Sequence, residues 1–130
     1  MENSASRILL VDDEPALLKM VGVYLGRLGY AVTTVGSTDK AWAEMEAAPE
    51  SFAVAVLDGT MPGLSMIDLA TRMLNANRSL RVLTASGYPV DITALEELAP
   101  GRVAFLHKPF TPEMLAAAIR RMLAAQEENI

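Results

Sequence analysis

Five short apolar segments, rich in β-branched side chains, alternate along the chain with segments of helical periodicity. Most of these segments are apolar at both odd and even positions, which is typical of strands that are covered on two faces, as in a parallel sheet. The pattern therefore predicts five β-strands, each followed by a helix. The predicted strands are residues 8–11, 31–35, 52–57, 81–85 and 103–106.

The intervening segments carry residues that commonly start or stop helices. Strands that alternate with helices favour one α/β domain, an open, doubly wound parallel sheet with helices on both faces. The pattern does not reveal the strand order, for which 2-1-3-4-5 is one of two common choices. The predicted helices run from Pro15 to Gly29, from Ser37 or Thr38 to Pro49, from Ser65 with Asp68 completing a capping box, from Asp91 to Leu98, and from Thr111 and Pro112 onward.

Composition narrows the function classes. The 130 residues suit a single domain, and 11 basic against 16 acidic residues give a net charge of −5. That charge argues against a surface that binds nucleic acid or anionic lipid. The chain has no cysteine and one histidine, which excludes disulfides, thiolate zinc sites and multi-histidine metal sites. No apolar run approaches a membrane span, so we expect a cytoplasmic protein.

Polar residues gather where the predicted strands end, which is where ligands bind in such sheets. Carboxylates about 5 Å apart repel by roughly 3 kcal/mol at an effective dielectric constant near 20, so a cluster of them favours a bound cation. Oxygen ligands without histidine or sulfur favour Mg²⁺ or Mn²⁺. A lysine and a hydroxyl beside that cation suit phosphoryl oxygens, and a carboxylate can act as nucleophile to form an acyl phosphate. The residues are Asp12, Asp13 and Glu14 after the first strand, Asp58 after the third, Thr84 and Ser86 at the fourth, and His107 and Lys108 at the fifth.

Each of these residues also has an ordinary interpretation. Asp12 and Asp13 could cap the helix that begins at Pro15, Asp58 could be a turn residue before a glycine, and Lys108 could be a solvated lysine. Their joint arrival at one sheet edge favours the functional interpretation. His107 has no partner histidine or cysteine and is interpreted as an ordinary residue at a strand end.

Four motifs, each at the end of a predicted strand, carry a family resemblance: residues 8–15 (ILLVDDEP), 57–63 (LDGTMPG), 83–87 (LTASG) and 105–110 (FLHKPF). Over residues 7–125 the chain resembles the receiver domain of two-component response regulators, with short tails at 1–6 and 126–130. The resemblance implies a flavodoxin-like (βα)5 fold with strand order 2-1-3-4-5.

The resemblance implies an acceptor and a metal site. Asp58 would accept a phosphoryl group from a phosphohistidine. Asp13 would bind Mg²⁺ directly together with Asp58, Asp12 would hold a water on the metal, and the backbone carbonyl of Thr60 would supply another ligand.

The resemblance also implies a switch. Lys108 would pair with the phosphoryl oxygens, and its bond to Pro109 is expected to be cis. Ser86 would be the hydroxyl that moves toward the phosphoryl group, with Thr84 as its rival, and Phe105 would reposition with it.

Two positions are expected to tune dephosphorylation: Thr60, two residues after the acceptor, and Tyr88, two residues after the switch hydroxyl. A bulky Tyr88 would shield the acyl phosphate, which predicts slow loss of the phosphoryl group. The chain departs from the family pattern at Met66, where glycine is usual, and at Gly59, where a larger apolar residue is common.

The implied donor is a sensor histidine kinase or a histidine phosphotransfer domain, and the implied protein is a monomer or a weak phosphorylation-dependent dimer. It would be no enzyme beyond its own phosphorylation and dephosphorylation. No DNA-binding or enzymatic output domain is expected in this chain, which would be either a stand-alone regulator or a piece of a larger protein. Residues 84–89 (TASGYP) resemble receivers attached to hybrid sensor kinases, which slightly favours the second origin.

Three other functions compete with this one. A flavin mononucleotide binder needs a hydroxyl- and glycine-rich loop after the first strand, where this chain has acidic residues. A haloacid-dehalogenase-type phosphatase needs a nucleophile at position 56, which is Val56. A pseudo-receiver that acts only as an interaction module would usually lack an acidic residue or the lysine, and this chain has both.

Overall fold

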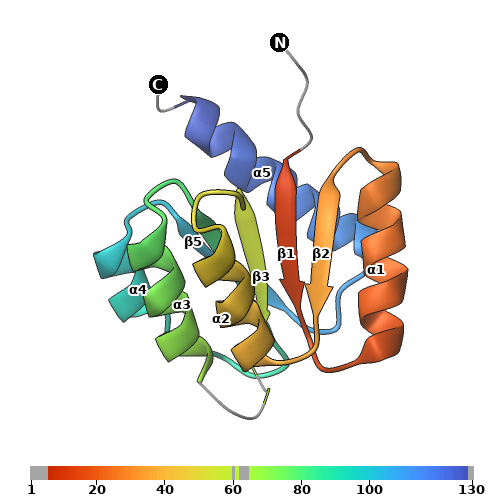
Figure 1. The fold of residues 1–130 in the computed structure, drawn as a ribbon, viewed down its shortest axis with the longest axis horizontal. Helices are drawn as coiled ribbons and strands as arrows, with labels where there is room; N and C mark the ends of the chain where they lie inside the picture. The colour runs from red at the N-terminus through yellow and green to blue at the C-terminus, as the bar shows by residue number, and fades with distance from the viewer. Residues whose placement is uncertain (1–5, 60, 62–64, 129–130) are drawn as a thin grey trace.

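The computed structural model describes residues 6–59, 61 and 65–128. Strands and helices alternate strictly along the described chain (Figure 1). The elements are β1 (Arg7–Val11), α1 (Pro15–Arg27), β2 (Ala31–Val35), α2 (Thr38–Ala47), β3 (Val54–Asp58), α3 (Met66–Ala76), β4 (Arg81–Ser86), α4 (Thr93–Leu98), β5 (Val103–His107) and α5 (Pro112–Glu128).

The five strands form one parallel sheet in the order β2-β1-β3-β4-β5, which confirms the predicted doubly wound fold and its strand order. The register places Asp58 opposite Ala85 and Ser86 opposite His107. The carboxyl ends of β3, β4 and β5 therefore meet at one edge of the sheet. The arrowheads of β1 and β2 point toward the same edge (Figure 1).

The apolar residues of each strand divide between two cores, one on each face of the sheet. Leu9 of β1 packs with α2, α3 and α4, whereas Ile8 and Leu10 pack with α1 and α5. All three side chains are 1% exposed or less. Because neighbouring side chains on a strand point to opposite faces, burial on both faces explains the uninterrupted apolar runs in the sequence.

Three predicted helix starts are confirmed by side-chain caps. The Ser65 hydroxyl accepts from the Asp68 N–H and the Thr111 hydroxyl from the Met114 N–H, both at 3.1 Å. Of the two candidates for α2, Ser37 is the cap, since its Oγ accepts from the Lys40 N–H at 3.1 Å.

Several predicted boundaries are wrong. Strand β3 begins at Val54 instead of residue 52 and ends at Asp58 instead of residue 57. Helix α4 begins at Thr93 instead of Asp91, because the Asp91 carboxylate accepts from the Thr93 N–H at 3.0 Å and forms a local turn ahead of the helix. Helix α5 continues through Glu128, so residues 126–128 belong to its last turn instead of to a tail. Alanine, glutamine and glutamate favour helix, and no glycine or proline stops α5 earlier. No helix in the described part of the chain is long and apolar enough to cross a membrane.

Candidate functional site

Three carboxylates from two strand ends converge at the carboxyl edge of the sheet. Asp12 and Asp13 follow β1, and Asp58 is the last residue of β3. One oxygen of each lies within 4.8 Å of the others. Asp12 and Asp58 are 3% and 5% exposed, whereas Asp13 is exposed to solvent. The cluster therefore combines two buried carboxylates with one that solvent can reach.

Lys108 brings a positive charge to this cluster from the end of β5. Its Nζ lies 3.1 Å from Asp12 Oδ2 and 3.4 Å from Asp58 Oδ1. The pKa of Lys108 is raised: burial on its own lowers it, but the hydrogen bond and charge of Asp12 and the charge of Asp58 outweigh that effect. The ammonium group is thus held in its charged form next to Asp58 at the end of β3.

The surroundings of Asp12 explain how a buried carboxylate is kept in place. Burial raises the pKa of Asp12 and the nearby charge of Asp58 acts in the same direction, while hydrogen bonds from the Glu14 N–H and Lys108 lower it without outweighing burial. Asp12 Oδ1 accepts from the Glu14 N–H at 3.0 Å. The N-cap residue of α1 is Glu14, whose side chain makes no cap hydrogen bond. A role for Asp12 at the start of α1 therefore explains only the contact of its Oδ1 atom, and leaves its Oδ2 atom to Lys108.

The two candidate hydroxyls of β4 have different partners. Thr84 is fully buried, and its hydroxyl donates to the Ala104 carbonyl at 3.0 Å, within the β4–β5 pair. The Ser86 hydroxyl lies at the strand end, where it accepts from the Tyr88 N–H at 3.1 Å. A hydroxyl that accepts one hydrogen bond keeps its own hydrogen available to donate. This arrangement favours Ser86 over Thr84 as the hydroxyl that serves the acidic cluster.

The remaining predicted residues differ in their exposure and in their neighbours. Phe105 is half-buried on β5 and meets the His107 ring edge-on, with 6.1 Å between ring centroids. Tyr88 is 72% exposed. The peptide bond between Lys108 and Pro109 is cis, as predicted. Thr60, predicted both as a metal ligand and as a tuning residue, lies outside the described residues.

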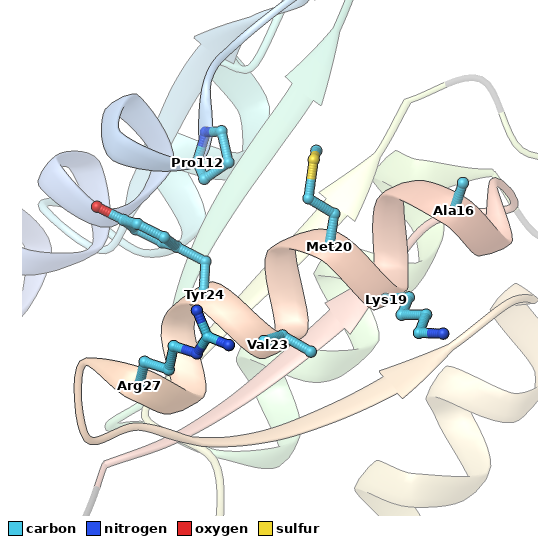
Figure 2. A pocket seen from close by; sticks show the side chains of 7 residues that line it. All are labelled: Ala16, Lys19, Met20, Val23, Tyr24, Arg27 and Pro112. Carbon is cyan, nitrogen blue, oxygen red and sulfur yellow. The ribbon is translucent and has the colours of Figure 1, made fainter.

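Two cavities include residues of α1 in their lining. One, of about 350 Å³, opens beside the cluster and is lined by Glu14, Leu17, Gly87, Lys108, Pro109 and Phe110. Sequence reasoning missed its apolar lining, although the Pro-Phe pair after Lys108 was a visible signal. A larger cavity of about 510 Å³ is lined by six residues of α1 together with Pro112, and includes none of the clustered aspartates (Figure 2).

The donor set fits a hard divalent cation. All three clustered groups are carboxylates, and the two buried ones share the positive charge of Lys108. Carboxylate oxygens are the ligands that Mg²⁺ uses in phosphate-handling sites, usually one or two of them together with several waters. The exposed position of Asp13 leaves room for those waters.

The fold and this site together match a known family. The chain belongs to the response regulator receiver domain family, whose model matches residues 8–120. It is therefore a receiver domain of the kind found in two-component systems.

Individual relatives agree with that family. The chain is 32% identical over 132 residues to the DNA-binding response regulator MtrA of Mycolicibacterium smegmatis, covering 99% of this chain and 55% of the relative. It is 33% identical over 121 residues to the transcriptional regulatory protein FixJ of Bradyrhizobium diazoefficiens, covering 92% and 58%. The chain thus spans little more than half the length of these relatives.

A solved structure shows the same fold over nearly the whole chain. The CheY-like response regulator receiver domain protein of Methanospirillum hungatei superposes with a TM-score of 0.85 at 27% identity. The alignment covers 98% of this chain and all of that chain.

Proposed function

We propose that this receiver domain accepts a phosphoryl group on Asp58 from the phosphohistidine of a sensor kinase or phosphotransfer domain. The observation that carries the proposal is the convergence of three carboxylates within 4.8 Å with the Lys108 ammonium 3.4 Å from Asp58. A buried carboxylate beside a fixed cation is suited to act as a nucleophile toward phosphorus, since the charge that develops on the phosphoryl oxygens has a partner in place.

Phosphoryl transfer to Asp58 forms one bond to phosphorus and breaks another. An Asp58 carboxylate oxygen attacks phosphorus, and the bond from phosphorus to the donor imidazole nitrogen breaks, with its electron pair returning to the ring. Lys108 pairs with the transferred oxygens. Hydrolysis reverses the modification: a water oxygen attacks phosphorus, the bond to Asp58 breaks, and inorganic phosphate leaves. The domain would thus catalyse only its own phosphorylation and dephosphorylation.

Asp12, Asp13 and Asp58 would hold Mg²⁺ or Mn²⁺, together with the Thr60 carbonyl outside the described residues. When bound, the ion would neutralise the negative charge gathered between these carboxylates and the phosphoryl oxygens. Phosphorylation would then draw Ser86 and Phe105 toward a second arrangement and bias a pre-existing equilibrium of the partner-binding face.

The donor would approach over the side of the molecule formed by α1 and the start of α5. The larger cavity lies there, and the smaller one is lined by Leu17 of α1 together with Lys108. The charged side chains within α1 are Lys19 and Arg27, both of which line the larger cavity, whereas Glu14 before α1 and Glu113 at the start of α5 are acidic. A donor with acidic residues around an apolar surface fits Lys19, Arg27 and the larger cavity on α1 best. We propose that the donor and this domain meet in the cytoplasm.

The direct test is intact mass after incubation with Mg²⁺ and acetyl phosphate. We expect a gain of one phosphoryl group that hydroxylamine removes, because hydroxylamine cleaves acyl phosphates. If neither acetyl phosphate nor a phosphorylated kinase labels the protein, the phospho-acceptor function is wrong and the pseudo-receiver alternative stands.

Magnesium alone should stabilise the folded protein, because the unfolded chain has no assembled carboxylate cluster. At 100 times its Kd, a ligand of the folded state adds about 2.7 kcal/mol to the free energy of unfolding, which raises Tm by several degrees. Thermal unfolding with Mg²⁺ or with NaCl at equal ionic strength measures this. Asp13→Asn should lose most of the rise, and an equal rise in that variant would contradict the assignment of Asp13.

Tyr88→Ala should shorten the lifetime of the phosphorylated form by a few-fold, since the side chain expected to hinder attacking water is removed. The decay of the phosphorylated mass after removal of acetyl phosphate measures the lifetime. Tyr88→Phe, which keeps the ring, is the matched control. An unchanged lifetime in Tyr88→Ala would show that this side chain does not shield the acyl phosphate.

A further inference from the structure

Gly59, the residue after the acceptor, makes an unusually close approach to the end of β4. A Cβ atom placed at position 59 would lie 3.1 Å from the Cβ of Ser86, 3.3 Å from the Ala85 carbonyl oxygen and 3.4 Å from the Ser86 hydroxyl. The first of these distances is shorter than ordinary van der Waals contact between carbons. Any side chain at this position would therefore press on Ser86.

Backbone conformation does not explain the glycine. The described glycines with positive φ are Gly29 and Gly101, and Gly59 is not among them. The Gly59 N–H donates to the Ala85 carbonyl at 2.7 Å, which any residue except proline could do. What glycine alone provides at this position is the absence of a Cβ.

Burial and two hydrogen bonds leave Ser86 little room to move away from a side chain at position 59. Ser86 is 2% exposed. Its carbonyl accepts from the Lys108 N–H at 2.8 Å on the β5 side, and its hydroxyl accepts from the Tyr88 N–H at 3.1 Å on the side of the loop toward α4. Gly59 lies against the remaining side. A displaced Ser86 would strain or lose the hydrogen bond from Tyr88.

We infer that Gly59 is a positioning residue: the missing side chain at position 59 lets the Ser86 hydroxyl rest against the end of β3, where it accepts the hydrogen bond from the Tyr88 N–H. This inference rests on the proposed function for its kinetic consequence, but the placement of Ser86 can be tested in the unphosphorylated protein. Gly59→Ala adds only the Cβ whose contacts are given above and is the smallest change that tests it.

The first measurement is amide hydrogen exchange at Tyr88 by NMR, without phosphodonor. Gly59→Ala should speed exchange at Tyr88 about tenfold, as expected for the displacement of one hydrogen bond. Gly36→Ala is the matched control, since a Cβ there would meet nothing closer than the Asp12 carbonyl oxygen at 3.9 Å. Unchanged exchange at Tyr88 in Gly59→Ala would overturn the inference, whether or not the protein can be phosphorylated.

The second measurement is a double-mutant cycle with Ser86→Ala, read by the rate of phosphorylation from acetyl phosphate and by urea unfolding. Ser86→Ala keeps the Cβ but removes the hydroxyl. Any loss of stability caused by Gly59→Ala should therefore also appear when Ser86 is already alanine. We expect Gly59→Ala alone to slow phosphorylation about tenfold, and to slow it by less than about twofold in the Ser86→Ala background. An equal rate effect in both backgrounds would show that Gly59 acts through general folding instead of through the hydroxyl. A parent protein that takes no phosphoryl group would refute the proposed function and leave the exchange result to decide the role of Gly59.

Discussion

Asp58→Asn should leave the protein without a phosphoryl group after incubation with acetyl phosphate and Mg²⁺, whereas the parent gains one. Asparagine keeps the size and shape of the side chain but offers an amide in place of the carboxylate nucleophile. Because Asp58 is 5% exposed, lies beside two other carboxylates and is 3.4 Å from Lys108 Nζ, the amide removes a charge repulsion and an ion pair together. These two effects on the free energy of unfolding oppose one another, so we expect this variant to be folded, with a stability close to that of the parent without Mg²⁺.

Intact mass measures the labelling, and urea unfolding measures the stability. Asp39→Asn, on the exposed surface of α2, is the matched control and should be labelled like the parent. Labelling of Asp58→Asn that hydroxylamine removes would place the acceptor at another carboxylate, and the assignment of Asp58 would be wrong.

Lys108→Ala should slow phosphorylation by acetyl phosphate about 10²–10³-fold, the usual cost of removing one group that stabilises developing negative charge. The Lys108 ammonium lies 3.1 Å from Asp12 and 3.4 Å from Asp58, so its loss leaves two buried carboxylates without their cation. Mg²⁺ should still stabilise this variant, since the three carboxylates remain. The initial rate of mass gain measures the effect.

Lys40→Ala removes an exposed lysine of α2 and should phosphorylate at the parent rate. Lys108→Arg tests geometry, because a planar guanidinium does not replace a compact ammonium group at a close contact. A rate within a few-fold of the parent in Lys108→Ala would mean that the observed ion pairs serve stability alone.

Local features of the fold were predictable because they depend on neighbouring residues. The caps at Ser65 and Thr111 follow from a side chain and a backbone N–H three residues apart. The errors were also local: the turn made by Asp91 competes with the first turn of α4, and helix-favouring residues carry α5 past residue 125. Propensity sets the type of an element more firmly than its ends.

Residue type alone did not separate Thr84 from Ser86, since both are small hydroxyl residues on the same strand, and only the family resemblance favoured Ser86 in the sequence. Tertiary structure separates them: the Thr84 hydroxyl is used by the neighbouring strand, while the Ser86 hydroxyl lies at the sheet edge. The contact between Gly59 and Ser86 was equally invisible, because the two residues meet only through the β3–β4 register. Position 59 stood out in the sequence only as a departure from the family pattern.

The sequence by itself determined the alternation of strands and helices, the burial of the sheet on both faces, and the residue types delivered to each strand end. These depend on periodicity and on short-range hydrogen bonds, which the order of residues encodes directly. Only the tertiary structure decided the distances: Lys108 contacts Asp12 across 96 residues because parallel pairing sets their two strand ends at one edge. Parallel strand pairing, and not the local sequence, thus brings an adjacent pair of aspartates, a distant third aspartate and a lysine into one site.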